Sequence, residues 1–205
     1  MSKDIFYDRE RAEEAVYFHH RDAKLIETLR QQAALAEIAH ALAEKLQADE
    51  PVLLENIRKL GVTLDTGAAF ILAPLVEVAW ADGHVSHAAR DAVLRVATRR
   101  GVVPGSADHR QLLDWLAHRP PETIFRAALE AIRVGISVLP PGERKERIAG
   151  IVGACEEVAH ATAGGLAKLL LTRSISDEEQ AVIDLVRNHL EGHGADGGER
   201  SGASH

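Results

Sequence analysis

Two Glu-x-x-His pairs are the residues whose types and spacing could bind a metal. Glu37 is followed by His40, and Glu157 is followed by His160. On a helix, this spacing places a carboxylate and an imidazole on one face, which is the pattern of di-iron carboxylate bundles. At about 100° per residue, however, both pairs lie opposite the apolar stripes of their own helices. We therefore expect them on solvated faces, with a divalent-metal site as the alternative.

A second candidate metal site is the short sequence that begins at Asp82. Asp82, His84 and His87 bring one carboxylate and two imidazoles around one turn, a mixture of oxygen and nitrogen ligands that suits a divalent cation. In the simpler interpretation, Asp82 and Gly83 form the turn and the two histidines are exposed beside it. The sequence leaves both interpretations open.

Two further glutamates could complete a di-metal centre, because such a centre also takes a glutamate from each of two other helices. Glu77 lies between Val76 and Val78 in a strongly apolar stretch, and Glu130 lies in a separate helical stretch. A buried Glu77 could equally be a structural carboxylate that is hydrogen-bonded to backbone or paired with an arginine. We favour this structural role, since no nucleophile, Gly-rich phosphate loop or Ser-His-Asp set accompanies Glu77.

The composition indicates a helical chain. Its 205 residues are 46% apolar but only 4% aromatic, and Val, Ile and Thr are not gathered into alternating runs. The net charge of −7 disfavours nucleic acid as a partner, since phosphate binding needs a basic face. A single cysteine excludes an internal disulfide and a cysteine-based zinc site. The sequence shows no membrane span or signal peptide, so we expect a cytoplasmic protein.

Breaks in the helical pattern divide the chain into three regions. Residues 1–48 read as one long N-terminal helix, because residues 8–48 contain neither proline nor glycine. Residues 49–190 form a helical domain, and residues 191–205 form a polar tail that we expect to be disordered. The first half of the long helix should project from the domain or pair with another helix, since its apolar stripe is thin. The stripe of the second half consists of Leu35, Ile38, Ala39, Leu42 and Leu46.

Serine, proline and glycine residues mark where the helices of the domain begin and end. Ser86 and Ser176 can cap the helices that follow them, while Gly61 and Gly101 can end the helices before them. The stretch 68–81 is apolar on nearly all sides and should be a core helix. The remaining helices are expected over residues 49–60, 86–100, 107–117, 121–138, 143–163 and 176–190.

An internal repeat runs through the domain. Residues 77–81 match residues 157–161, and Ser86 with the residue before it matches Ser176 with the residue before it. Each copy reads as a helix, a turn and a serine-capped helix, and neither copy can bury its apolar face alone. We expect the two copies to pack together about a pseudo-twofold axis.

These repeated residues resemble the tellurite-resistance TerB-like family of all-helical domains. The family pattern of Ala-Asp-Gly, a hydrophobic residue and a serine cap is met at residues 81–86, and the end of its second unit at residues 176–179. The resemblance covers about residues 65–190 and implies paired helical units, with the acidic turn residues as candidate divalent-metal ligands. This chain has Ala89 where the family has a glutamate.

The N-terminal sequence FYDRERAEEAVYF resembles the inhibitory segment of the mitochondrial ATP synthase inhibitor family. In that family the segment inserts as a helix at a catalytic interface of the F-type ATPase and blocks ATP hydrolysis. The resemblance implies that Glu10, Glu13 and Glu14 meet basic groups. It also implies that the aromatic pair, Tyr17 and Phe18, fills apolar pockets. The alternative is that the aromatic pair packs on the chain's own domain or on a second copy. The positions in register with the family pattern are Phe6, Arg9, Glu10, Ala12, Glu13, Glu14, Tyr17 and Phe18.

The sequence therefore favours an all-α helical bundle with a pseudo-twofold repeat and a long N-terminal helix. We expect a non-enzymatic regulatory or stress-associated protein whose N-terminal helix binds a protein partner. An F-type ATPase is the candidate partner, and self-association is the competing use of the helix. The alternative function is a metal-binding helical stress protein, with a divalent metal as its candidate cofactor.

Overall fold

The computed structural model describes residues 21–22, 26, 30, 37–162 and 175–192 of the chain. Every regular element within these ranges is helical, as the composition predicts. A helix over residues 37–49 leads into the domain. The elements that follow are α2 (Pro51–Lys59), the 3₁₀ turn η1 (Leu64–Thr66), α3 (Gly67–Ile71), α4 (Ala73–Ala79), α5 (His87–Arg99), α6 (Ala107–Ala117), α7 (Glu122–Ile136), α8 (Pro141–Thr162) and α10 (Asp177–Glu191).

Serine side chains begin three of these helices. The hydroxyl oxygens of Ser86, Ser106 and Ser176 each accept a 3.1 Å hydrogen bond from a backbone N–H of the first turn of α5, α6 and α10. At α10 the carboxylate of Glu179 also accepts a 3.0 Å bond from the Ser176 backbone N–H, which completes a capping box. Each cap satisfies an N–H that has no partner inside its helix. The caps predicted at Ser86 and Ser176 are confirmed.

The predicted helix over residues 68–81 is wrong as a single element. It is divided at Leu72 into α3 and α4, and Leu72 has φ −90° and ψ 0°. Pro74 stands in the first turn of α4, and a proline has no N–H to donate to the preceding turn. The core position predicted for this stretch is nevertheless confirmed, since α4 buries Ala73, Leu75, Val76, Val78 and Ala79.

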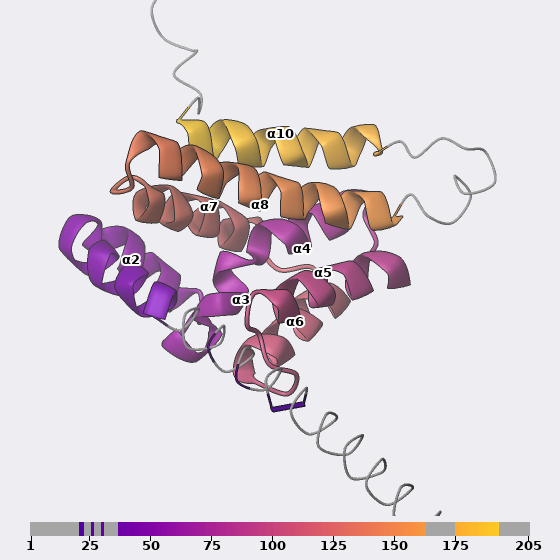
Figure 1. Cartoon of the computed structure of the whole chain (residues 1–205), viewed down its shortest axis with the longest axis horizontal. Coiled ribbons are helices and arrows are strands. Elements are labelled where there is room, and N and C mark those ends of the chain that lie inside the picture. The colour runs from indigo at the N-terminus through magenta and orange to yellow at the C-terminus, as the bar shows by residue number, and fades with distance from the viewer. Residues whose placement is uncertain (1–20, 23–25, 27–29, 31–36, 163–174, 193–205) are drawn as a thin grey trace, which may run out of the picture.

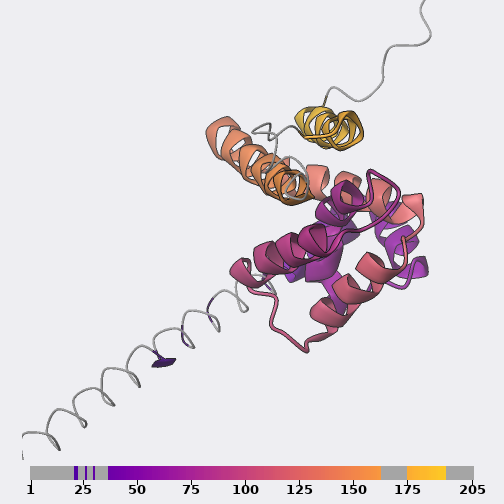
Figure 2. The ribbon, with the colours of Figure 1, turned by 90° about the vertical axis from the view of Figure 1, so that its right-hand side faces the viewer.

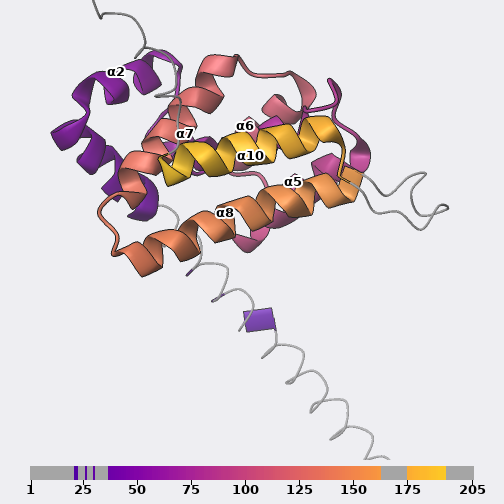
Figure 3. The ribbon, with the colours of Figure 1, turned by 90° about the horizontal axis from the view of Figure 1, so that it is seen from above.

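The helices pack in layers around α4. α8 and α10 run side by side (Figures 1 and 3). They form an outer layer over α4, α5 and α7 (Figure 2), and α2 packs on α7 at one end of the molecule. The centre of the core is made of fully buried aliphatic side chains from α4, α5, α6, α8 and α10, including Val76, Val93, Leu112, Val158 and Ile183. None of the described helices is both long and apolar enough to cross a bilayer.

The helix over residues 37–49 attaches to the domain through a narrow apolar edge. Ala39 and Leu46 are buried and Leu42 is half-buried, but Ile38 is 47% exposed, so its predicted place in the stripe is wrong. Two glycines allow the close approach: a Cβ on Gly67 of α3 would lie 3.0 Å from the Ala39 Cβ, and one on Gly135 of α7 would lie 3.0 Å from Leu42 Cδ1. The contacts with α3 and α7 therefore turn Ile38 outward.

Candidate functional site

The turn between α4 and α5 is joined to the start of α10. Asp82 lies in this turn, where Gly83 adopts a φ of 81°, a left-handed conformation that favours glycine. The Asp82 Oδ1 accepts a 3.0 Å hydrogen bond from the Ser176 hydroxyl. The same hydroxyl oxygen caps α10, so one side chain both starts a helix and ties it to the distant turn.

The Asp82 turn does not gather metal ligands. Within the part of the chain that the structure describes, no three His, Cys, Asp or Glu side chains lie close enough to hold a metal ion. Asp82, His84 and His87 therefore do not converge, although they are close in sequence. The His84 ring approaches the Asp82 carbonyl oxygen at 3.4 Å, which is a local contact within the turn.

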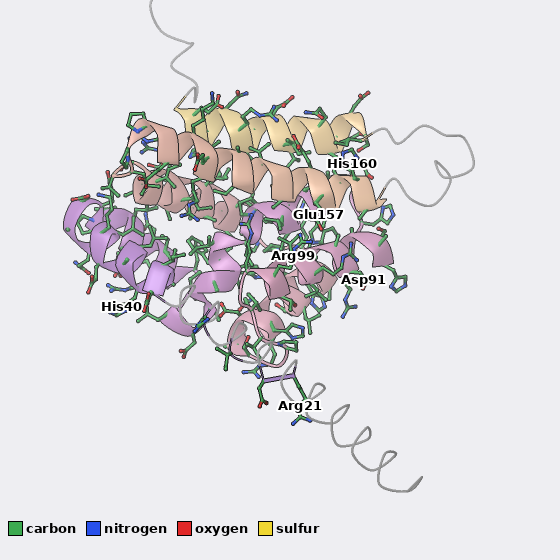
Figure 4. The ribbon with its side chains drawn as sticks, in the orientation of Figure 1. Arg21, His40, Asp91, Arg99, Glu157 and His160 are labelled. Carbon is green, nitrogen blue, oxygen red and sulfur yellow. The ribbon has the colours of Figure 1, made fainter. Side chains whose placement is uncertain are left out.

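The two Glu-x-x-His pairs lie apart, and each has partners of its own. Glu37 and His40 are exposed, and the His40 Nε2 lies 3.7 Å from the Glu44 carboxylate one turn later. Glu157 of α8 pairs with Arg99 of α5, and the side chain of His160 is exposed beyond this pair (Figure 4). His40 lies at the opposite side of the molecule from Glu157 (Figure 4). The structure thus does not bring the two pairs together.

Glu77 is the polar exception in α4, and it is paired with an arginine as the structural interpretation predicts. Its Oε1 accepts a 3.2 Å hydrogen bond from Arg119, while its Oε2 is buried and has no hydrogen-bond partner among the described residues. Burial raises the pKa of the Glu77 carboxyl above 4.5, and Arg119 offsets part of this effect. Glu77 also lines a hollow of about 330 Å³ together with Phe125 and Leu185. Sequence suggests an arginine partner for Glu77 but does not identify Arg119, because the two residues are 42 positions apart.

Glu130 takes part in a different cluster, at the contact of α7 and α10. Its Oε2 accepts a 2.9 Å hydrogen bond from the Arg133 Nε and lies 3.2 Å from the His189 Nε2. The hydrogen bond from Arg133 lowers the pKa of the Glu130 carboxyl, with His189 adding to the effect. The two glutamates proposed to complete a di-metal centre are therefore each engaged by a cation.

The residues predicted to bind a partner lie outside the described residues; they are Phe6, Arg9, Glu10, Glu13, Glu14, Tyr17 and Phe18. The nearest described positions in the same region, Arg21, Asp22, Ile26 and Arg30, are helical and exposed. Arg21 lies away from the packed helices (Figure 4), and the Ile26 side chain is 49% exposed. Residues 163–174 and 193–205 also lie outside the described residues.

The single cysteine is a core residue of α8. Cys155 is fully buried, and burial raises the pKa of its thiol to about 12. A thiol of this kind is mostly protonated and poorly nucleophilic at neutral pH.

Comparison of the chain with protein-family models, with curated proteins and with solved structures finds no match.

Proposed function

We propose that the chain is a regulatory protein that acts by binding a protein partner through residues 1–48. The observation that carries this proposal is a contrast in solvent exposure along this region. Ala39 and Leu46 are buried against the domain, whereas every described position before residue 37 is exposed. An anchored base with an exposed upstream part suits a binding arm, because the arm can meet a partner without disturbing the core.

The residue types of this N-terminal arm, residues 1–48, support an F-type ATPase as the partner. Glu10, Glu13 and Glu14 would meet basic groups at the catalytic interface, and Tyr17 and Phe18 would enter apolar pockets as anchors. Such aromatic anchors commonly carry about 2 kcal/mol or more of binding free energy each. The aromatic pair should therefore decide affinity, while the glutamates should affect orientation and association rate.

We assign residues 49–190 to a TerB-like domain of two helix-turn-helix units. The hydrogen bond between Asp82 and Ser176 supports this assignment, since it joins the turn of the first unit to the serine cap of the second. Ser86, the matching cap of the first unit, begins α5 in the same way that Ser176 begins α10. In this proposal the domain is a rigid base for the arm in a stress-associated role.

A binding measurement tests the proposal. Purified F-type ATPase catalytic complex is immobilised, and the full chain is titrated over it by biolayer interferometry. We expect saturable binding that weakens at least tenfold in the double variant Tyr17→Ala and Phe18→Ala. The control replaces two exposed apolar side chains outside the arm, Val138→Ala and Leu185→Ala, and should bind like the wild type.

Sedimentation velocity of the full chain alone separates this proposal from self-association. A dimer that dissociates in the Tyr17→Ala and Phe18→Ala variant would assign the aromatic pair to a second copy instead. A monomer that binds the ATPase supports the proposal. Absence of ATPase binding at micromolar chain concentration would overturn it.

A further inference from the structure

A hollow of about 640 Å³ opens where the end of α7, the first half of α8 and the end of α10 meet. Buried apolar side chains from all three helices form part of its lining. These side chains are Ile136, Ile148, Val152 and Leu190. The volume lies within the range of about 300–1,000 Å³ that is typical of small-molecule sites.

Four cationic side chains line the same hollow, although the chain as a whole carries a net charge of −7. Two of them are neutralised: Arg133 pairs with Glu130, and Arg187 lies 3.2 Å from the Glu156 carboxylate. The other two, Arg144 and Lys145, form no ion pair within the described part of the chain. Glu156 and Glu191 also line the hollow, so its lining has four cationic and two anionic side chains and carries an excess of positive charge beside an apolar wall.

Arg144 is held in place by the backbone. Its Nη2 donates to the Ser137 carbonyl oxygen at 2.7 Å and to the Leu139 carbonyl oxygen at 3.3 Å, beyond the end of α7. Its Nε is buried and has no acceptor in the described structure. These bonds are to neutral carbonyl groups, so the charge of the guanidinium remains uncompensated and available to an anion.

Gly153 lines the hollow and has open space beside it. It lies in the middle of α8, where a glycine costs about 1 kcal/mol relative to alanine, and a Cβ there would meet no atom within 4 Å. Local helix stability would favour a larger residue at this position. Gly150, one turn earlier, is equally open but does not line the hollow.

We propose that this hollow binds a small amphipathic anion, with a carboxylate or phosphate head against Arg144 and Lys145 and an apolar tail along Ile148, Val152 and Leu190. The head would exchange water for charge-assisted hydrogen bonds, and the tail would cover aliphatic surface beside Gly153. This site is independent of the N-terminal arm and of any partner that the arm binds.

Calorimetric titration of the full chain tests the site with three probes that share a ten-carbon tail: decanoate, decyl phosphate and decylammonium. We expect saturable binding of at least one of the two anions, and binding of the cation that is at least tenfold weaker. Gly153→Leu should fill the hollow and weaken anion binding at least tenfold. Gly150→Leu, the matched control on the same helix, should stay within about twofold of the wild type.

A second pair of variants tests the charge. Lys145→Gln should weaken anion binding severalfold, whereas Arg147→Gln removes the same charge from an exposed residue outside the hollow and should not. A preference for one of the two anions identifies the head group. Equal binding of decylammonium, unchanged binding by Gly153→Leu, or no anion binding at millimolar probe would each overturn the proposal.

Vesicles containing phosphatidylglycerol distinguish a free ligand from a membrane surface. In a co-sedimentation assay, we expect the full chain to stay in solution. Sedimentation with the vesicles that is the same for wild type and Gly153→Leu would show that the surface charge binds headgroups without the hollow, and would also overturn the proposal.

Discussion

The Ser176 hydroxyl donates a hydrogen bond to the Asp82 carboxylate across 94 positions of sequence, with an oxygen–oxygen distance of 3.0 Å. The same hydroxyl oxygen accepts the backbone N–H of Glu179 and so caps α10. One small side chain therefore couples the start of the last described helix to the turn between α4 and α5. This coupling has a measurable consequence for stability.

Ser176→Ala should lower the free energy of unfolding by more than the loss of a cap alone. A serine cap is worth about 1 kcal/mol, and the bond to Asp82 should add about 0.5 kcal/mol. Ser106→Ala is the control, since Ser106 caps α6 and its hydroxyl has no other partner in the described structure. Urea unfolding of the double-mutant cycle with Asp82→Ala measures the coupling directly. A coupling energy of zero would contradict the role given to this bond.

Gly67→Ala should loosen the helix over residues 37–49. The new Cβ would lie 3.0 Å from the Ala39 Cβ, which is too close for either small side chain to avoid by rotation. We expect faster amide hydrogen exchange over residues 37–49, while the core of α4 stays protected. Gly142→Ala, where a Cβ meets no atom within 4 Å, is the control. Unchanged exchange in the Gly67 variant would mean that the helix is not held by this contact.

Glu77→Gln should change how stability depends on pH. The pKa of Glu77 is raised above 4.5 in the folded chain, so its contribution to stability is full below 4.5 and is lost as pH rises through the raised pKa. The glutamine variant lacks this loss. Its stability relative to the wild type should therefore increase from about pH 4 to about pH 7, as measured by urea unfolding.

The charge-matched control for Glu77 is Glu178→Gln, at an exposed position of α10. It makes the same change in net charge without touching the Arg119 pair. A difference between Glu77→Gln and the wild type that stays constant over this pH range would contradict the assigned direction of the pKa shift.

Sequence predicted the local features of the fold well, because they depend on neighbouring residues. Ser86 and Ser176 can be recognised as caps from their own positions, and α6 has the predicted bounds because its signals are local. Sequence also indicates the break at Leu72, because Pro74 follows two residues later. The continuous apolar run around Leu72 nevertheless favoured a single helix. The exposure of Ile38 was not readable, because glycines on α3 and α7 decide which edge of its helix is buried.

Candidate sites were harder to predict from sequence, because spacing places side chains on one helix face but does not bring faces together. Glu157 shares a helix face with His160, yet its partner is Arg99 of another helix. Asp82 has a turn with two histidines beside it, yet it bonds to Ser176. Pairs of this kind arise from the packing of α4, α5, α8 and α10, and no residue near either partner signals them.

Inhibition of ATP hydrolysis is the most direct test of partner binding by residues 1–48. The full chain is added in increasing amounts to purified F-type ATPase, alongside the variant Tyr17→Ala with Phe18→Ala and the control Val138→Ala with Leu185→Ala. We expect saturable inhibition by the wild type and the control, and at least a tenfold weaker effect of the arm variant at unchanged melting temperature. Full hydrolysis in the presence of excess wild-type chain, or equal inhibition by the arm variant, would contradict the proposal.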